Sequence, residues 1–353
     1  SYQSPVNKQV TTVFLGKAMN SCHSDLPVEQ IQPVSLPTDR YNLLVLLGPT
    51  AVGKTSLGVR LARHFGAEII SADSRQVYRH LDLGSGKDLD EYTLPDGTKI
   101  PYHLIDITDL SREYSVFDYQ TDFYKAFKEI SGRKVLPLVV GGTGMYLDSF
   151  IRNYDLVPVP ENPQLRQELE QLSLEELDAM LLKLCPDFHT TAHLRDRNRV
   201  IRHIEIKKFM ESPALQEFRK TQEAKPELKP FILGTTIERQ LLRQNIARRL
   251  KERFDEGMIA EVEQIHKNGT SWERLESLGL EYKFISEYLE GKIAGFDKLI
   301  EKLNLAIGQF AKRQETWFRG MEKKGVKINW LPSVPDSSIK FENAVNMIQQ
   351  AFL

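Results

Sequence analysis

One segment of the sequence has the residue types and spacing that hold phosphate groups. Gly48–Thr55, which reads GPTAVGKT, matches the pattern GxxxxGK[ST] at every fixed position. Its glycines allow backbone N–H groups to turn inward as an anion nest, and the helix that follows adds the partial positive charge of its N-terminus. Lys54 supplies a cation for a terminal phosphate, and the hydroxyl of Thr55 can hold Mg²⁺. The segment predicts a phosphate-binding loop, which by itself does not specify the reaction.

A carboxylate is expected beside this loop. Asp73 closes the short apolar segment Glu68–Asp73, which we interpret as a strand. Because the carboxyl ends of parallel strands line the ligand crevice of a sheet, Asp73 should face whatever the loop holds. A carboxylate there can coordinate Mg²⁺ or accept a proton from an attacking nucleophile. It can also be the N-cap of a helix that follows it, and the sequence leaves these roles open.

The elements that position these residues alternate between strands and helices. Short apolar runs predict buried strands at Leu43–Leu47, Glu68–Asp73, His103–Ile107 and Val135–Val140. The amphipathic stretch Phe117–Ile130 predicts a helix between the last two of them. This rhythm is typical of an α/β fold with a P-loop and a doubly wound, mostly parallel sheet.

Two proline-rich connectors, at 154–163 and 225–230, interrupt this rhythm. The helical pattern between them predicts a helical insertion domain over residues 154–230. Strands expected at Phe231–Thr235 and Ile328–Leu331 return the chain to the sheet, so that 41–153 and 231–332 form the catalytic core. The polar, proline-containing residues 1–40 predict an ill-ordered N-terminal arm, and 333–353 predict a C-terminal tail or helix.

The composition is that of a globular protein. Of 353 residues 41% are hydrophobic, and no apolar run reaches the roughly 18 residues that cross a membrane. The two cysteines, Cys22 and Cys185, form neither a disulfide framework nor a zinc site, and they favour a reducing, cytoplasmic compartment. The net charge is −1, but basic residues gather in Arg239–Arg253 and Lys312–Lys327. These two segments predict either polyanion-binding faces or solvated amphipathic helices.

Four segments in order resemble those of the tRNA dimethylallyltransferase family, the tRNA isopentenyltransferases. They are GPTAVGKTS at 48–56, DSRQVY at 73–78, GGTGMY at 141–146 and KRQETWFR at 312–319. The basic stretch NRVIRHIEI at 198–206 is also similar, and the resemblance runs from about Leu43 to Leu331. No cysteine follows Cys185, so the sequence resembles the bacterial form, which lacks the C-terminal zinc finger of many eukaryotic relatives.

The resemblance implies a reaction and its catalytic residues. A prenyltransferase of this family moves a dimethylallyl group from dimethylallyl diphosphate to N6 of the adenine at position 37 in the tRNA anticodon loop, giving i6A. Asp73 would hydrogen-bond the amine and take its proton, and Thr143 would lie beside the reacting groups. The diphosphate and Mg²⁺, the latter held by Thr55, would occupy the loop. The expected diphosphate contacts are Gly48, Thr50, Ala51, Val52, Gly53, Lys54, Thr55 and Arg249.

The resemblance also implies where the tRNA anticodon stem-loop binds. The target adenine is stacked in its loop and must be flipped into a pocket before it can react. The expected RNA contacts lie near the flipped base, on the insertion and toward the C-terminus: Asp73, Ser74, Arg75, Gln76, Arg166, Asn198, Arg199, Arg202, Tyr282, Lys283, Lys312, Arg313, Gln314 and Arg319. Trp317 and Phe318 are expected in a helix core. Because members of this family are often monomeric, we expect a monomer.

Three residues depart from the family pattern. Glu281 and Lys283 replace the Gly and Arg of a Gly-Tyr-Arg element, and Asn245 stands where an Arg is expected. Lys is a poorer bidentate phosphate ligand than Arg, so the resemblance leaves the contact of this element open. A small hairpin expected at Thr93–Thr98 has no assigned role.

Three other functions remain as alternatives. An adenylate isopentenyltransferase, which makes cytokinin from free AMP, ADP or ATP, would share the loop and Asp73 but would not need the basic segments. A small-molecule kinase would need a Mg²⁺ carboxylate, for which Asp106 is the candidate. An RNA-binding protein with a degenerate loop would not be expected to keep Lys54 and Thr55.

Overall fold

The computed structural model describes residues 33, 40–186 and 196–352. The expected N-terminal arm, residues 1–40, lies almost entirely outside the described residues. The strands are β1 (Leu43–Leu47), β2 (Glu68–Ala72), β3 (Tyr102–His103), β4 (Pro137–Gly141), β5 (Pro230–Gly234) and β6 (Asn329–Trp330). They form a six-stranded parallel sheet in the order β3-β2-β4-β1-β5-β6. This sheet confirms the expected doubly wound α/β fold.

The strand order brings three functional segments together. β4 lies between β1 and β2, and its last residue, Gly141, pairs with both Leu47 and Ala72. The residues that follow these partners are Gly48 of the phosphate-binding loop, Asp73, and Gly142. Since parallel strands all end at the same edge of a sheet, the three segments must leave it side by side.

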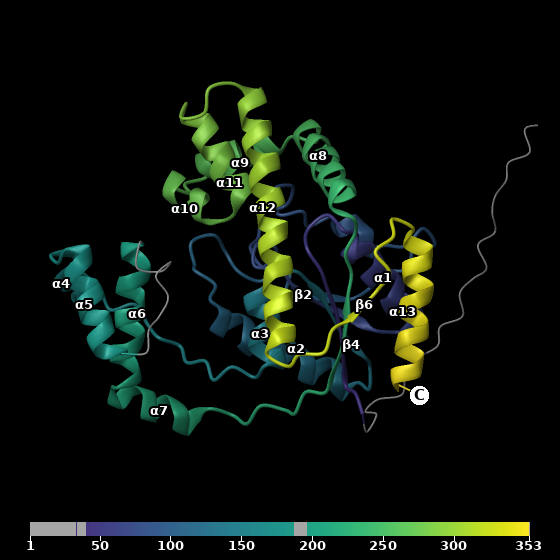
Figure 1. Cartoon of the computed structure of the whole chain (residues 1–353), viewed down its shortest axis with the longest axis horizontal. Coiled ribbons are helices and arrows are strands. Elements are labelled where there is room, and N and C mark those ends of the chain that lie inside the picture. The colour runs from purple at the N-terminus through teal and green to yellow at the C-terminus, as the bar shows by residue number, and fades with distance from the viewer. Residues whose placement is uncertain (1–32, 34–39, 187–195, 353) are drawn as a thin grey trace, which may run out of the picture. The chain divides into compact units, whose positions relative to one another are not determined.

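Helices cover both faces of the sheet, because every central strand is buried on both sides. Alternate β1 residues point to opposite cores: Val45 belongs to one buried cluster with α2, α3 and α8–α12, and Leu44 to another with α1 and α13 (Figure 1). The helices of this part of the chain are α1 (Lys54–Phe65), α2 (Val116–Gly132), α3 (Gly144–Ile151), α8 (Arg239–Asp255), α9 (Met258–Lys267), α10 (Trp272–Ser277), α11 (Leu280–Leu289), α12 (Phe296–Lys323) and α13 (Ser337–Phe352), with a 3-10 turn, η1 (Leu89–Tyr92).

The structure shortens the expected third strand and contains the expected small hairpin. The third strand was expected over His103–Ile107, but β3 ends at His103 because Leu104 and Asp106 have φ angles of 65° and 56°, which no strand accommodates. The expected hairpin is present as an antiparallel bridge between Thr93 and Lys99. At the C-terminus, α13 packs on α1 and β5 and completes the second core.

The segment between the connectors contains four further helices with a core of their own. They are α4 (Pro163–Glu170), α5 (Leu174–Leu184), α6 (Arg197–Met210) and α7 (Pro213–Thr221). Apolar side chains of α4, α5 and α6 form a separate buried cluster that includes Leu177, Leu181 and Ile204. These helices agree with the expected helical pattern, whereas the division into domains remains a prediction.

A buried carboxylate ties two of these helices together. The Glu205 side chain on α6 is only 1% exposed, and it accepts hydrogen bonds from Arg166 on α4, from Arg202 and from the backbone N–H of Asn162. Burial raises the pKa of this carboxyl, but the hydrogen bonds more than offset that effect and the pKa falls to about 2. The ionised form therefore stabilises the fold of the insertion.

The Glu205→Gln change is expected to loosen α4 and α6, because the amide loses the charge that both guanidinium groups bind. We expect a local loss of about 1.5–3 kcal/mol at neutral pH, read as faster hydrogen exchange in residues 163–170 and 197–210. Since the folded pKa is depressed from 4.5 to about 2, the difference from wild type should shrink as the pH falls through that interval. The matched control is Glu217→Gln, an exposed pair with Lys220 on α7, and equal exchange in both variants would contradict the role of Glu205.

Candidate active site

The phosphate-binding loop lies between β1 and α1, where the sequence predicts it. Gly53, the N-cap of α1, has φ 81°, and Ala51 has φ 62°; this left-handed backbone turns successive N–H groups toward one side. A Cβ atom on Gly48 would overlap the backbone oxygen of Thr235, so only glycine lets β5 approach the loop this closely. The loop is thus shaped both by its own glycines and by the neighbouring strand.

A glutamine of α12 connects the loop to the end of β4. The backbone N–H of Thr50 donates to Oε1 of Gln314 at 2.9 Å, and Nε2 of Gln314 donates to the backbone oxygen of Gly142 at 2.9 Å. Gln314 is 8% exposed, so this amide joins loop, strand and helix inside the protein. Trp317 lies one turn further along α12, where a Cβ atom on Gly144 would overlap its ring. The glycines at 142 and 144 therefore allow α12 to approach this closely.

The loop lines a cavity of about 610 Å³, here called the loop pocket. Arg249 and Arg253 of α8 line its opposite wall, and both pair with Asp88, at 3.1 Å and 2.8 Å. Asn245, one turn before Arg249, donates to the backbone oxygen of Ala51 and thereby holds the loop. The pocket thus presents backbone N–H groups and several cations to a bound anion.

Lys54 lies in the loop pocket and donates to the backbone oxygen of Pro49 at 2.5 Å. Burial lowers the pKa of its ammonium group from 10.5 to about 7; Asp73 opposes this shift and Arg249 adds to it. A phosphate that contacts Lys54 would favour the charged form of the side chain. Binding of an anion is therefore coupled to the protonation of Lys54.

A second cavity, of about 300 Å³, also has Asp73 in its lining and is here called the aromatic pocket. Its walls include Tyr78, Tyr114, Tyr146 and Phe310. The Arg274 guanidinium lies over the Tyr78 ring, 5.4 Å from its centroid, and donates to the backbone oxygens of residues 110 and 112. Planar aromatic walls of this kind suit a planar heterocycle.

Asp73 lines both pockets, as does Arg75. Oδ1 of Asp73 accepts hydrogen bonds from the backbone N–H groups of Arg75 and Gln76, at 2.9 Å and 3.3 Å, but residues 74–77 form a turn, so Asp73 caps a turn and not the helix that was expected. Among the described residues, no group donates to Oδ2, which leaves this oxygen for a ligand. Thr143 lines the aromatic pocket and accepts from the backbone N–H of Ser74 at 3.0 Å. The structure therefore brings the two expected catalytic residues to one junction.

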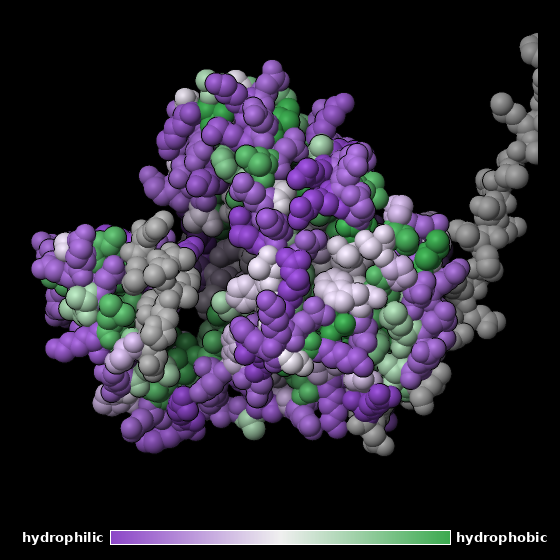
Figure 2. Space-filling view, in the orientation of Figure 1, coloured by the Kyte–Doolittle hydropathy of each residue, from purple (hydrophilic) through white to green (hydrophobic). Residues whose placement is uncertain are grey.

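Most of the expected RNA contacts on α12 lie on its outer face. Lys312, Arg313 and Arg319 are exposed, and Figure 2 shows a largely hydrophilic surface over α12. Phe318 is fully buried as expected, but Trp317 is 37% exposed because it covers Gly144 rather than entering the core.

Two expected RNA contacts take internal positions instead. Tyr282 is fully buried and donates to Oε1 of Glu261 at 2.7 Å, so it exposes no surface to RNA in this structure, and its contact with RNA stays a prediction. Both ends of the Gln314 amide are bonded inside the protein, which assigns it a structural role here. In both cases the family motif indicates that the residue type matters, but it does not show which neighbour in the fold the side chain contacts.

The other expected RNA contacts differ in how much of their charge is already paired. Asn198 and Arg199 on α6 are exposed, and Lys283 on α11 is 46% exposed. Arg166 and Arg202 both bind Glu205, so the insertion offers RNA less free charge than its sequence suggests. The exposure and pairing of these side chains do not show whether they contact RNA, so these contacts remain predictions.

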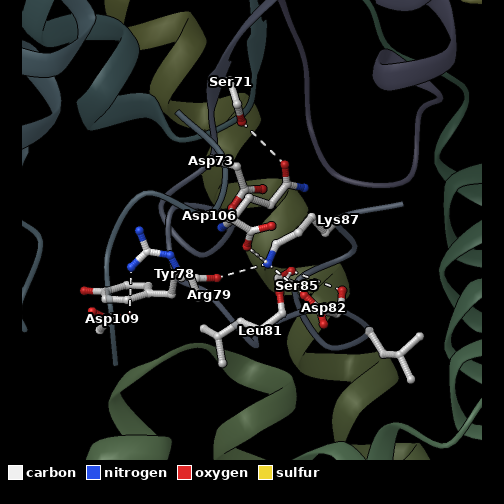
Figure 3. Close-up of polar contacts among 12 residues, drawn as sticks. Ser71, Asp73, Tyr78, Arg79, Leu81, Asp82, Ser85, Lys87, Asp106 and Asp109 are labelled. Atoms are coloured by element: carbon white, nitrogen blue, oxygen red, sulfur yellow. Dashed lines mark hydrogen bonds and ion pairs between the residues drawn. The ribbon is translucent and has the colours of Figure 1, made fainter. Parts of the chain in front are cut away.

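Asp106 is not the Mg²⁺ ligand that a kinase would need. It binds the ammonium group of Lys87, which is 2% exposed and also binds Asp82 and the backbone oxygen of Tyr78 (Figure 3). Asp106 does not line the loop pocket. Lys87 instead fixes the loop that carries Ser85, Gly86 and Asp88 into that pocket.

The residues present fit a Mg²⁺ ion held jointly by protein and ligand. Among the described residues, no three His, Cys, Asp or Glu side chains gather as a metal site. Mg²⁺ is usually held by one or two protein ligands together with phosphate oxygens and water. Thr55, half-buried in the first turn of α1, lines the loop pocket and can supply one such ligand.

Several pocket residues were not expected from the sequence. Tyr78 and Tyr146 belong to the quoted motifs DSRQVY and GGTGMY, so their presence was visible although no role was assigned. Arg253, Asp88 and Arg274 carried no signal, because only the packing of α8 and α10 against distant loops brings them to the pockets. A basic helix in the sequence does not show which of its cations face inward.

Binding of inorganic diphosphate should take up a proton above pH 7, because Lys54 is then largely neutral in the free protein and charged in the complex. At pH 8 we expect uptake of roughly one proton, measured by calorimetry in buffers with different ionisation enthalpies. Affinity should fall as the pH rises above about 7. In the Lys54→Arg variant the guanidinium stays charged, so any proton taken up or released on binding comes from the diphosphate and not from residue 54. If wild type and this variant took up the same number of protons, the coupling to Lys54 would be refuted.

Replacing Gln314 by methionine should destabilise the whole core, because the Thr50 N–H and the Gly142 oxygen both lose their partner. We expect the free energy of unfolding to fall by about 1–3 kcal/mol and diphosphate affinity to fall with it, measured by denaturant titration and calorimetry. The control Lys312→Met, on the exposed face of the same helix, should change stability by less than about 0.5 kcal/mol. Unchanged stability in Gln314→Met would contradict this structural role and would favour the predicted contact of Gln314 with RNA.

Two family models match this chain. The IPP transferase model matches residues 76–321, more than half of the sequence, and the Isopentenyl transferase model matches residues 41–99. A tRNA dimethylallyltransferase 2 of Treponema denticola is 52% identical over 295 residues, which cover 83% of this chain and 97% of that relative. A tRNA dimethylallyltransferase 2 of Bacteroides fragilis is 45% identical over 310 residues, covering 88% and 97%.

Solved structures agree with these matches. The tRNA isopentenylpyrophosphate transferase of Bacillus halodurans superposes with a TM-score of 0.64 and 32% identity, covering 89% of this chain and 97% of that one. A eukaryotic dimethylallyltransferase solved acting on tRNA superposes with a TM-score of 0.69 and 26% identity, covering 87% and 77%. Because the family model matches more than half of the sequence and relatives about 50% identical cover most of it, this chain belongs to the IPP transferase family.

Proposed function

We propose that this protein transfers a dimethylallyl group from dimethylallyl diphosphate to N6 of adenine 37 in the tRNA anticodon loop. The observation that carries the proposal is the position of Asp73 between the loop pocket and the aromatic pocket. Relatives that cover most of this chain are named tRNA dimethylallyltransferases, and one similar structure was solved acting on tRNA.

The loop pocket suits the diphosphate of the donor. Backbone N–H groups at the start of α1, together with Lys54 and Arg249, form a positively charged site for this anion. Mg²⁺, when bound with Thr55 as a ligand, would neutralise part of the charge on the leaving group. Apolar side chains of Ile237, Leu241 and Ile246 also line the pocket, and such surfaces can accept the hydrocarbon part of the donor.

The aromatic pocket suits the acceptor base. A base flipped out of its loop can stack between aromatic side chains, and Tyr78, Tyr114 and Phe310 offer such surfaces. Its amine would then reach the junction between the pockets, where Oδ2 of Asp73 lies without a described partner. Thr143 is positioned beside it to orient the amine or the carboxylate.

The chemistry follows from this arrangement. The bond between the allylic carbon and the diphosphate oxygen breaks while the adenine N6 forms a bond to that carbon. Lys54 and Arg249 stabilise the charge that develops on the leaving diphosphate. The proton lost by the amine passes to Asp73 as general base. The products are the alkylated adenine and free diphosphate.

The proposal extends to the binding of RNA and to the state of the protein. The exposed cations Lys312, Arg313 and Arg319 on α12, with Asn198 and Arg199 on the insertion, are available for phosphate contacts. The described residues include no helix long and apolar enough to cross a bilayer. We further propose a cytoplasmic monomer, as the cysteine content and the resemblance predict.

One observation favours the alternative function, prenylation of free adenine nucleotides. The Isopentenyl transferase model matches residues 41–99, which hold the phosphate-binding loop and Asp73. A protein that prenylates free adenine nucleotides would use the same half of the site. It would have no need of the exposed basic residues on α12, and these favour the RNA substrate.

The decisive assay offers radiolabelled dimethylallyl diphosphate and Mg²⁺ with either an anticodon stem-loop that has adenine 3′ of the anticodon, or free AMP. Label should enter the RNA, and Asp73→Asn should slow this transfer by about 10²–10⁴-fold because the amide cannot accept the proton. The control Asp109→Asn changes an exposed pair with Arg79 outside both pockets and should keep the wild-type rate. Label in AMP instead of RNA would indicate the nucleotide prenyltransferase, and turnover of ATP alone would indicate a kinase.

A further inference from the structure

Three charged side chains lie in a row where the two pockets meet. Nη1 of Arg75 donates to Oε2 of Glu281 at 2.5 Å, and Nε of Arg75 lies 4.0 Å from Oδ1 of Asp73. The side chains of Asp73, Arg75 and Glu281 are 27%, 18% and 12% exposed, so water screens this row only in part. The guanidinium thus binds one carboxylate and lies just beyond hydrogen-bond distance of the other.

Glu281 is held in place by the structure around it. It lies in the first turn of α11, next to Gly279, where a Cβ atom would overlap the Arg75 side chain. The next residue, Tyr282, donates to Glu261, which in turn accepts from the backbone N–H of Leu83 at 2.7 Å. Glycine at 279 therefore lets Arg75 lie against the start of α11, and the Tyr282 bond fixes this helix to the wall of the loop pocket.

Arg75 stays cationic in this position. Burial lowers the pKa of its guanidinium, but Glu281 and Asp73 raise it, and the net shift of the pKa is upward. A partly buried cation needs a carboxylate partner. Without Glu281, Arg75 would have Asp73 as its neighbouring carboxylate, and the guanidinium would have to move only a short distance to bind it bidentately.

We propose that Glu281 is a positioning residue for prenyl transfer: by binding Arg75 it keeps the guanidinium off Asp73, so that a carboxylate oxygen of Asp73 stays available to the acceptor amine. The inference rests on the proposed role of Asp73 as base. It gives a role to Glu281, a departure from the family pattern that the resemblance left without one. Glu281 itself touches neither reacting group.

The test compares rates of transfer to the anticodon stem-loop for wild type, Glu281→Gln, Glu281→Asp, Arg75→Gln and the double variant Arg75→Gln/Glu281→Gln. Glu281→Gln should lower kcat by about tenfold or more, because a general base contributes 10²–10⁴-fold and is here partly blocked. KM for RNA and for dimethylallyl diphosphate should change by less than about twofold, since neither substrate loses a contact. Glu281→Asp, which keeps the charge, should recover part of the loss.

The double variant separates this mechanism from a general structural effect. If Glu281 acts through Arg75, then adding Glu281→Gln to Arg75→Gln should cause little further loss, whereas independent effects would multiply. Glu290→Gln, which breaks an exposed pair with Lys292 at the end of the same helix, is the matched control and should retain the wild-type kcat.

Three results would overturn the inference while the proposed function stands. They are a wild-type kcat in Glu281→Gln, a loss confined to KM for RNA, and fully multiplicative losses in the double variant. If Glu281→Gln unfolds, the same decision is reached from Glu281→Asp and from the double variant, in which no unpaired guanidinium remains. Failure of wild type to label RNA would instead sink the proposed function, and this inference with it.

Discussion

The amide of Gln314 is the contact on which the geometry of the site depends. A phosphate-binding loop is strained and rich in unpaired N–H groups, so something outside the loop must fix it. Here Gln314 accepts from Thr50 and donates to Gly142, and Asn245 supports Ala51 from the other side. Because the two amides come from α12 and α8, the loop is positioned by residues that follow it by 264 and 194 positions in sequence. The C-terminal helices are therefore part of the site, and α12 also carries exposed basic residues on its outer face.

Strand order explains why Asp73 lies beside this loop. β4 enters the sheet between β1 and β2, so that the loop, Asp73 and the Gly142 segment leave neighbouring strands at one edge. Both pockets have Asp73 in their lining. In the proposed reaction, the diphosphate and the nucleobase would occupy separate pockets and meet at this carboxylate. Such a separation would protect the activated allylic group from competing reactions.

The sequence predicted the elements with strong local signals and missed the contacts that depend on distant partners. The loop, β1, β2, β4, β5 and α2 follow from apolar runs, glycines and periodicity, and the structure confirms them. The predicted length of the third strand was wrong, because the pattern of apolar residues does not show that residues 104 and 106 have left-handed backbone angles. Tyr282 and Gln314 were assigned to RNA since a motif shows that a residue type matters but not which neighbour it serves. Two walls of the aromatic pocket, Tyr78 and Tyr146, lie in recognisable motifs, but the pocket itself could not be predicted because it forms only when α10 and α12 pack beside the strand ends.

The charged residues of this chain illustrate the same limit. Arg166 and Arg202 neutralise a buried glutamate, Arg249 and Arg253 share Asp88 in the loop pocket, and Lys312 and Arg313 are exposed. All six look alike in sequence, yet only the last two carry charge that is free to meet a polyanion without giving up an internal partner. A net charge of −1 consequently says little about RNA binding. RNA binding depends instead on whether each cation already has a partner inside the protein. The same principle applies to Glu281, which binds Arg75 and so leaves the carboxylate of Asp73 free to react.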